Sequence, residues 1–364
     1  MNTTPLANRK HIALVGKTNA GKSSLLNALV GQEVSLVSPI RGTTTDPVTK
    51  PVEFLPLGPV AFIDTAGLED PGELGELRQE KTLEALKRAD LALYVIDAQE
   101  VNQDLEKEAF SLFKAYHLPY LLVFNKIDLL SPGEVAKLKK AYPQALLVSA
   151  TTGHNLPRLK EEIIKVLEGG EEEQPLVGDL VPPGGRVLLV VPLDAAAPKG
   201  RLILPQVQLI RDCLDHGLKC YVVRDLELDQ ALSDLPEIDL VVTDSQIFKK
   251  VAAQVPSGIF LTSFSILYAR HKGELATFVA GARKIQDLQE GSRILIAESC
   301  SHNRTHEDIG RVKLPAMLQK FTGKSLAFHF CAGHDFPQDL TNYDLVVHCG
   351  ACMFNRKAML QRIW

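Results

Sequence analysis

The chain has 364 residues, of which 45% are hydrophobic and 23% are charged, and its formal net charge at pH 7 is −4. This length predicts two or three domains, and this composition is typical of a folded globular protein rather than a disordered or fibrous one. The slightly acidic charge argues against a general attraction to nucleic acid or to an anionic membrane surface.

The sequence contains no feature of a secreted or membrane protein. Residues 1–10 have no apolar core of a signal peptide, and six cysteines are too few for a disulfide scaffold. The longest uncharged stretch, residues 251–269, contains Pro256, Gly258 and several hydroxyl side chains, which favours a strand, a turn and a helix start over a membrane span. We therefore expect a cytoplasmic protein that has neither nucleic acid nor membrane as a partner.

Strand-like and helical segments alternate over residues 10–169. The apolar runs are HIALVG, PVAFIDTAG, ADLALYVID, PYLLVFNKID and QALLVSA, and amphipathic segments separate them. This alternation predicts βαβ units and a mostly parallel sheet, which we assign to a domain of residues 1–170. The acidic run EGGEEEQ and the following PPGG indicate a linker at about residues 168–185.

The same alternation resumes beyond the linker, so the fold class is α/β throughout. The runs RVLLVVPL, KCYVVR, IDLVVT and GIFLTS come first, and a long helix is predicted around residues 266–290. The runs RILIAESC, SLAFHF and YDLVVHCG follow it. We predict three α/β domains in all, with the second at residues 171–265 and the third at residues 266–364.

A phosphate-binding loop is predicted in the first domain. Residues 16–23 read GKTNAGKS, the pattern GxxxxGKS, between a strand and a helix. The glycines let backbone N–H groups point inward at phosphates, and the helix adds its positive end. Lys22 is expected to reach the β- and γ-phosphates and Ser23 to bind Mg²⁺. The predicted loop contacts are Gly16, Asn19, Ala20, Gly21, Lys22, Ser23 and Ser24.

Two further segments suit a γ-phosphate. Asp64 ends a strand in the run DTAG, so we expect it to bind Mg²⁺ through water while the Gly67 N–H meets the γ-phosphate. Residues 41–46, RGTTTD, form a polar loop in which a threonine hydroxyl completes the Mg²⁺ shell when a γ-phosphate is present.

Two later segments suit guanine. Residues 125–128 read NKID, and Asp128 is expected to accept hydrogen bonds from the N1–H and exocyclic amine of guanine. Asn125 and Lys126 belong to the same site, and a backbone N–H at Ser149–Ala150 is expected to meet the guanine O6. These segments follow strand ends in the order that a GTPase requires, so the sequence predicts a GTP- and GDP-binding enzyme.

This domain resembles the potassium-activated P-loop GTPases of the TrmE–Era group. Asn19 and the run GTTTD at residues 42–46 carry the likeness. The resemblance implies that Thr44 is a Mg²⁺ ligand and that Asn19 helps to hold K⁺. Leu68 stands where Ras-like proteins have a water-orienting glutamine, so the cation would take the place of an arginine finger. The expected catalytic residues are Lys22, Ser23, Thr44, Asp64 and Gly67, and those that bind Mg²⁺ are Ser23, Thr44 and Asp64.

The third domain contains a predicted metal site. Residues 300–302 read CSH and residues 348–352 read HCGAC, and each group follows a strand. Ligands at the carboxyl ends of two strands of one sheet meet in the crevice above it. From the spacing alone, a tetrahedral zinc, a 4Fe–4S cluster with an exchangeable corner and a redox dithiol at Cys349 and Cys352 all remain open.

The whole chain resembles the HydF family, the GTPases that mature FeFe-hydrogenase. The likeness rests on C-x-H followed by H-C-x-x-C, joined to the GTPase domain. It implies a 4Fe–4S cluster on Cys300, Cys349 and Cys352 with a labile fourth iron site, and a homodimer formed through the middle domain. It also implies a scaffold that receives a transient diiron precursor and delivers it to apo-hydrogenase, with radical-enzyme maturation factors as further partners.

The fourth ligand and one alternative function remain open. His302 and His348 are candidate ligands, and so are the carboxylates of Glu298, Glu307 and Asp308. The other histidines and cysteines of the region and of the middle domain are expected on the surface or in packing: His306, His329, His334, Cys331, Cys213 and Cys220. The alternative is a regulatory GTPase in ribosome or RNA maturation whose Cys/His site holds structural zinc.

Overall fold

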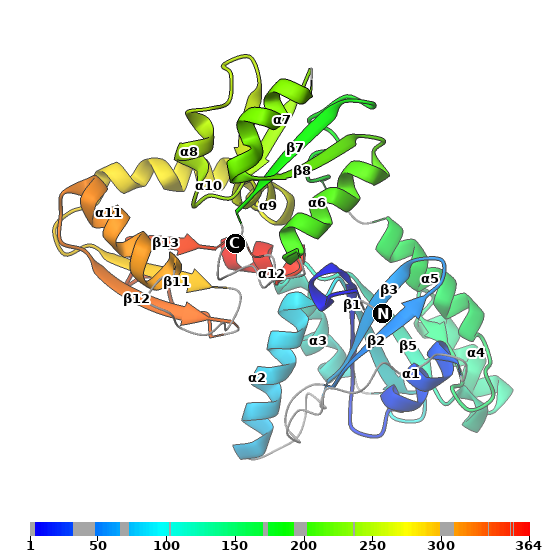
Figure 1. Ribbon diagram of the computed structural model, residues 1–364. Coiled ribbons are helices and arrows are strands. Elements are labelled where there is room, and N and C mark those ends of the chain that lie inside the picture. The colour runs from blue at the N-terminus through cyan, green and yellow to red at the C-terminus, as the bar shows by residue number, and fades with distance from the viewer. Residues whose placement is uncertain are drawn as a thin grey trace. The chain divides into compact units, whose positions relative to one another are not determined.

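The computed structural model describes residues 4–31, 48–65, 73–101, 103–169, 174–192, 202–235, 237–298, 309–333, 335–349, 351 and 353–364. By its internal contacts the chain divides into two compact units, Met1–Glu171 with Trp364 and Glu172–Ile363. Among these described residues the first unit contains one sheet and the second contains two, and helices lie between most of the consecutive strands (Figure 1).

The first unit is built on a six-stranded sheet with the order β2-β3-β1-β4-β5-β6. β2 pairs antiparallel with β3, and all other pairs are parallel. The strands are β1 (Lys10–Val15), β2 (Val48–Phe54), β3 (Gly58–Asp64), β4 (Leu91–Asp97), β5 (Tyr120–Asn125) and β6 (Leu146–Leu147). The mostly parallel sheet confirms the predicted class, whereas the antiparallel β2 was not foreseen.

Helices cover both faces of this sheet, which therefore has two cores. Leu25 and Ile163, from α1 and α5, belong to one core, and Leu86 and Phe113, from α2 and α3, belong to the other. Strands buried on both faces explain the continuous apolar runs in the sequence. The helices are α1 (Lys22–Val30), α2 (Glu73–Arg88), α3 (Gln103–Ala115), α4 (Pro132–Ala141) and α5 (Leu156–Glu168).

The second unit begins with a parallel four-stranded sheet in the order β10-β9-β7-β8. Its strands are β7 (Arg186–Val191), β8 (Lys219–Arg224), β9 (Leu240–Thr243) and β10 (Phe260–Ser263). Its helices are α6 (Leu204–Asp215), α7 (Leu228–Asp234), α8 (Phe248–Ala252) and α9 (Phe264–Lys272). Cys213 and Cys220 pack in its core with Leu267 and Tyr268 of α9.

The rest of the second unit is a parallel three-stranded sheet in the order β12-β11-β13. Its strands are β11 (Arg293–Glu298), β12 (Ala327–Ala332) and β13 (Leu345–His348). The helices of this part are α10 (Leu275–Arg283), α11 (Leu314–Thr322) and α12 (Arg356–Ile363). In the described part of the chain, no helix combines the length and the apolar character needed to cross a membrane.

The long helix predicted around residues 266–290 is wrong, because the chain forms α9 and then α10 there. Gly273 ends α9 in an extended conformation, at φ −128° and ψ −151°. A Cβ at this position would lie 2.5 Å from Cε2 of Phe278, so the bend also requires the absence of a side chain. Leu267 and Tyr268 of α9 pack in the core of the middle sheet, and the domain boundary at residue 265 stays a prediction.

Candidate functional site

The phosphate-binding loop lies between β1 and α1, at the carboxyl edge of the first sheet. Gly16 has φ 146° and Gly21 has φ 86°, backbone conformations that side chains disfavour. A Cβ on Gly16 would lie 2.0 Å from the Val95 carbonyl oxygen, and one on Gly21 would lie 2.4 Å from Nδ2 of Asn125. Both glycines are therefore required by close approach as well as by backbone conformation.

Lys22 and Ser23 begin α1 and have polar partners around the loop. The Lys22 ammonium donates to the carbonyl oxygens of Gly16 at 2.8 Å and Lys17 at 2.9 Å. The Ser23 hydroxyl donates to Asp64 Oδ2 at 2.7 Å, which brings together oxygen ligands from α1 and β3. Mg²⁺ prefers such oxygens and keeps several waters. The pair fits the Mg²⁺ expected with a nucleotide in a GTPase fold.

Asn125 joins the phosphate loop to the segment after β6. Its side chain is 1% exposed; Nδ2 donates to the Ala20 carbonyl at 3.1 Å, and Oδ1 accepts from the Ala150 N–H at 3.0 Å. Asn125 therefore holds two segments of the predicted site in place. Because the Ala150 N–H already has this acceptor, a guanine O6 would have to share that donor. Asp128 is exposed in the short helical turn Ile127–Leu129.

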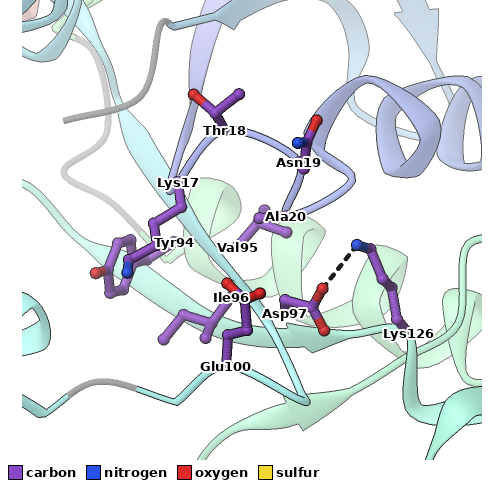
Figure 2. A pocket seen from close by; sticks show the side chains of 10 residues that line it. All are labelled: Lys17, Thr18, Asn19, Ala20, Tyr94, Val95, Ile96, Asp97, Glu100 and Lys126. Carbon is purple, nitrogen blue, oxygen red and sulfur yellow. Dashed lines mark hydrogen bonds and ion pairs between the residues drawn. The ribbon is translucent and has the colours of Figure 1, made fainter. Parts of the chain in front are cut away.

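Asp97 is a residue that the sequence reasoning missed. Its carboxylate lies 2.7 Å from the Lys126 ammonium, and Figure 2 shows the two side chains pointing toward each other. Asp97 also accepts from the Gln99 N–H at 3.0 Å, so it is fixed to its own turn. The sequence pattern that could have identified Asp97 is an acidic residue at the end of the strand-like run ADLALYVID. In the structure this residue ends β4 and pairs with Asn125 of β5.

A hollow of about 110 Å³ lies beside the loop, lined by residues 17–20, the end of β4 and Lys126 (Figure 2). Asn19 borders it and is exposed, with a left-handed φ of 65°. The predicted role of Asn19 in holding K⁺ stays a prediction. Thr44, Gly67 and Leu68 lie outside the described residues, as does the whole RGTTTD loop.

In the third sheet, the predicted metal ligands emerge from neighbouring parallel strands. Ala297 of β11 pairs with His348 of β13, and the Cys349 N–H donates to the Ala297 carbonyl at 3.0 Å. The chain reaches Cys300 two residues after β11 ends at Glu298. Cys349 thus lies at the sheet edge from which the Cys300 segment departs, and this position suits a shared site.

Several predicted ligands lie outside the described residues: Cys300, Cys352, His302, Glu307 and Asp308. Within the described part of the chain, no three His, Cys, Asp or Glu side chains gather as a metal site. Cys331 of β12 pairs with Ala297, and burial raises the pKa of its thiol, which favours a protonated packing residue. Glu298 is 6% exposed and lies 3.4 Å from Nε of Arg311, so the candidate fourth ligand has a basic partner.

Arg362 of α12 is a second residue that the sequence reasoning missed. Its guanidinium lies 2.8 Å from Nε2 of His348 and also contacts the Gly333 carbonyl. Burial lowers the pKa of Arg362, while the sulfurs of Cys331 and Cys349 oppose that shift. A buried basic side chain therefore lies near both Cys349 and Cys331.

A cavity of about 460 Å³ adjoins Cys349, between α9 and α10 on one side and β13 and α12 on the other. Apolar side chains such as Phe278 and Val347 line most of it. Lys272, which is 4% exposed, and Arg362 are also in its wall, and the described lining contains no carboxylate. Of the predicted metal ligands, His348 and Cys349 border this cavity, and the thiolates predicted for the site are donors that suit a soft metal.

Comparison with known proteins places the first unit among GTPases. A family model described as 50S ribosome-binding GTPase matches residues 11–126. GTPase Der of Wolinella succinogenes is 39% identical over 168 residues, covering 43% of this chain and 36% of that protein. The tRNA modification GTPase MnmE of Chromobacterium violaceum is 39% identical over 161 residues, covering 43% of this chain and 34% of that protein. GTPase Era of Aquifex aeolicus is 35% identical over 173 residues, covering 44% and 58%.

The chain spans about a third of the length of the Der and MnmE proteins, so these matches describe the GTPase domain alone. Different families match the second unit. A model of the hydrogen maturase F dimerization domain matches residues 176–273, and one of the hydrogen maturase F tetramerization domain matches residues 276–364. These two matches support oligomerisation and together cover just over half of the chain. The chain therefore belongs to the hydrogen maturase F family and carries an N-terminal P-loop GTPase domain similar to those of Der, MnmE and Era.

Proposed function

We propose that this protein is a GTP-hydrolysing scaffold in the maturation of FeFe-hydrogenase. It holds a 4Fe–4S cluster on Cys300, Cys349 and Cys352, receives a diiron precursor and delivers that precursor to apo-hydrogenase. The observation that carries the proposal is the place of Cys349: it lies at the edge shared by β11 and β13 and borders the cavity of about 460 Å³.

The chemistry of the cavity suits this cargo. A diiron unit with CO, cyanide and dithiolate ligands is compact and carries negative charge. Lys272 and Arg362 supply positive charge in a mostly apolar wall, where electrostatic attraction is stronger than in water. A labile corner on the cluster would let the cargo attach through a bridging ligand and leave by exchange.

The GTPase domain would regulate when partners bind. Ser23, Thr44 and Asp64 would hold Mg²⁺, and Asn19 would help to hold K⁺, which stimulates hydrolysis. The γ-phosphate would order the RGTTTD loop, and its loss would release that loop, changing the surface offered to the radical-enzyme partners and to apo-hydrogenase. Maturation at the wild-type rate by a Lys22→Ala variant without GTPase activity would exclude this regulation.

The test of the metal centre is the metal content of the full chain, purified without oxygen and reconstituted with iron and sulfide. A Cys300→Ala/Cys349→Ala/Cys352→Ala variant is the control. About four irons and four sulfides per chain, with an EPR signal after reduction that the variant lacks, is the expected result. One tightly held zinc without iron uptake would refute the scaffold and support the regulatory GTPase with structural zinc.

A further inference from the structure

The imidazole of His348 has a polar neighbour at each ring nitrogen. Nδ1 lies 2.8 Å from the Cys349 carbonyl oxygen, and Nε2 lies 2.8 Å from a terminal nitrogen of Arg362. His348 directly precedes Cys349, one of the proposed cluster ligands. How this ring is held therefore decides whether it has a lone pair to offer a metal bound by Cys349.

The chemistry of the neighbours determines where the proton of the ring lies. A guanidinium only donates hydrogen bonds and a carbonyl oxygen only accepts them. Nε2 must therefore accept from Arg362, and Nδ1 must carry the proton and donate to Cys349. A metal binds imidazole through a nitrogen lone pair. In this arrangement Nδ1 has none to offer, and the Nε2 lone pair is occupied by Arg362.

The position of Arg362 is itself well fixed. Its guanidinium carbon lies 4.6 Å from the ring centre of Phe336 and 4.4 Å from that of Phe354, within the range of cation–π contacts. It also donates to the Gly333 carbonyl. Moving the guanidinium away from His348 would also break these contacts, and they therefore support the hydrogen bond to Nε2.

We propose that Arg362 is a positioning residue that holds His348 away from the metal and thereby keeps one corner of the cluster open for cargo. The inference rests on the proposed cluster function. Without Arg362, the Nε2 lone pair becomes available beside Cys349, and the imidazole closes the open corner.

Pulsed EPR on the reduced cluster tests this in the full chain with ¹⁵N-labelled histidine. We expect no directly bound histidine nitrogen in the wild type and a strong ¹⁵N coupling in Arg362→Met, which the added change His348→Gln abolishes. Arg362→Lys keeps a donor and should resemble the wild type. Arg356→Met is the matched control, because Arg356 also lies on α12 but donates to the carbonyls of His271 and Gly273.

Histidine coupling in the wild type that His348→Gln removes would overturn the proposal, as would its absence from Arg362→Met. A second measurement needs no cluster. Diethyl pyrocarbonate acylates an imidazole at a nitrogen with a free lone pair, and peptide mass spectrometry reports the rate at each histidine. We expect Arg362→Met to raise the rate at His348 about tenfold, as for the loss of a charge-assisted hydrogen bond.

His329 is the internal reference for the acylation, because it is exposed and its Nδ1 contacts the Tyr343 hydroxyl at 3.1 Å, away from Arg362. Equal His348 rates in the wild type and Arg362→Met would refute the hydrogen bond in solution. A chain that takes up no iron would refute the proposed function instead, and the acylation rates would still decide whether Arg362 protects His348.

Discussion

The phosphate loop and the Cys349 region both follow the carboxyl ends of parallel strands, but they are assembled differently. The phosphate loop is one continuous segment whose shape depends on Gly16 and Gly21 and on local bonds such as that of Lys22 to Gly16. The Cys349 region combines two neighbouring strands with Arg362, which comes from the last helix. The phosphate loop is therefore a local site, formed by consecutive residues. The Cys349 region is a dispersed site, which depends on the packing of segments that are separated in the chain.

The largest effect is expected at Gly16, where the comparison predicts that a single methyl group disables the local site. Gly16→Ala would place Cβ 2.0 Å from the Val95 carbonyl, at a φ that alanine disfavours. We expect the free energy of unfolding of the first unit to fall by about 3 kcal/mol and guanine nucleotide binding to be lost. Denaturant unfolding and titration with a fluorescent GDP measure both.

Gly153→Ala is the control for this change, because Gly153 has φ 75° and nothing lies within 4 Å of its Cβ position. Gly153→Ala should lower the free energy of unfolding of the first unit by about 1 kcal/mol, because it introduces backbone strain alone. Equal losses in the two variants would show that the close approach to β4 does not matter for the loop.

Asp128 tests whether the base is recognised by one local contact. Asp128→Asn should weaken GTP binding about 100-fold, since the amide would present a donor to the guanine donors. The same variant should gain affinity for xanthosine triphosphate, whose base has an acceptor where guanine has its amine. Competition binding with both nucleotides measures the switch, and unchanged GTP affinity would contradict the guanine assignment.

Met359 tests the dependence of the dispersed site on packing. It is 3% exposed and shares a small core with Ala351 and Phe354, next to the cysteine segment. Met359→Ala should lower the stability of the second unit by about 2 kcal/mol, through lost burial and a cavity. Iron retention against a chelator should fall while the Kd for GDP stays unchanged. A change in GDP affinity without loss of iron would contradict the view that this packing supports the Cys349 region and not the phosphate loop.

The smallest effect is expected at Asp97, which acts through Lys126. Asp97→Asn removes the charge partner at 2.7 Å but keeps the size of the side chain. Because both groups are partly exposed, we expect the free energy of GDP binding to weaken by about 1 kcal/mol, which is roughly a fivefold lower affinity. Isothermal titration measures it, and a variant with wild-type affinity would assign the ion pair to stability alone.

Much of the first unit could be predicted from the sequence. The apolar runs around Ile12, Leu93 and Val123 became buried parallel strands, because strands covered on both faces need no polar alternation. The antiparallel β2 was missed because its run, VTKPVEF, contains a charge on each side of a proline. The break at Gly273 was missed because the helical pattern on either side of it is continuous.

The sequence by itself determined the phosphate loop, the order of the segments predicted to bind guanine and the positions of the cysteines after strand-like runs. These features depend on neighbouring residues, whose backbone geometry the chain encodes directly. Only the tertiary structure decided that Asp97 contacts Lys126 across β4 and β5, and that Arg362 contacts His348. Such partners are far apart in the chain and meet because burying apolar surface brings their elements together, which leaves no periodic signal in the sequence.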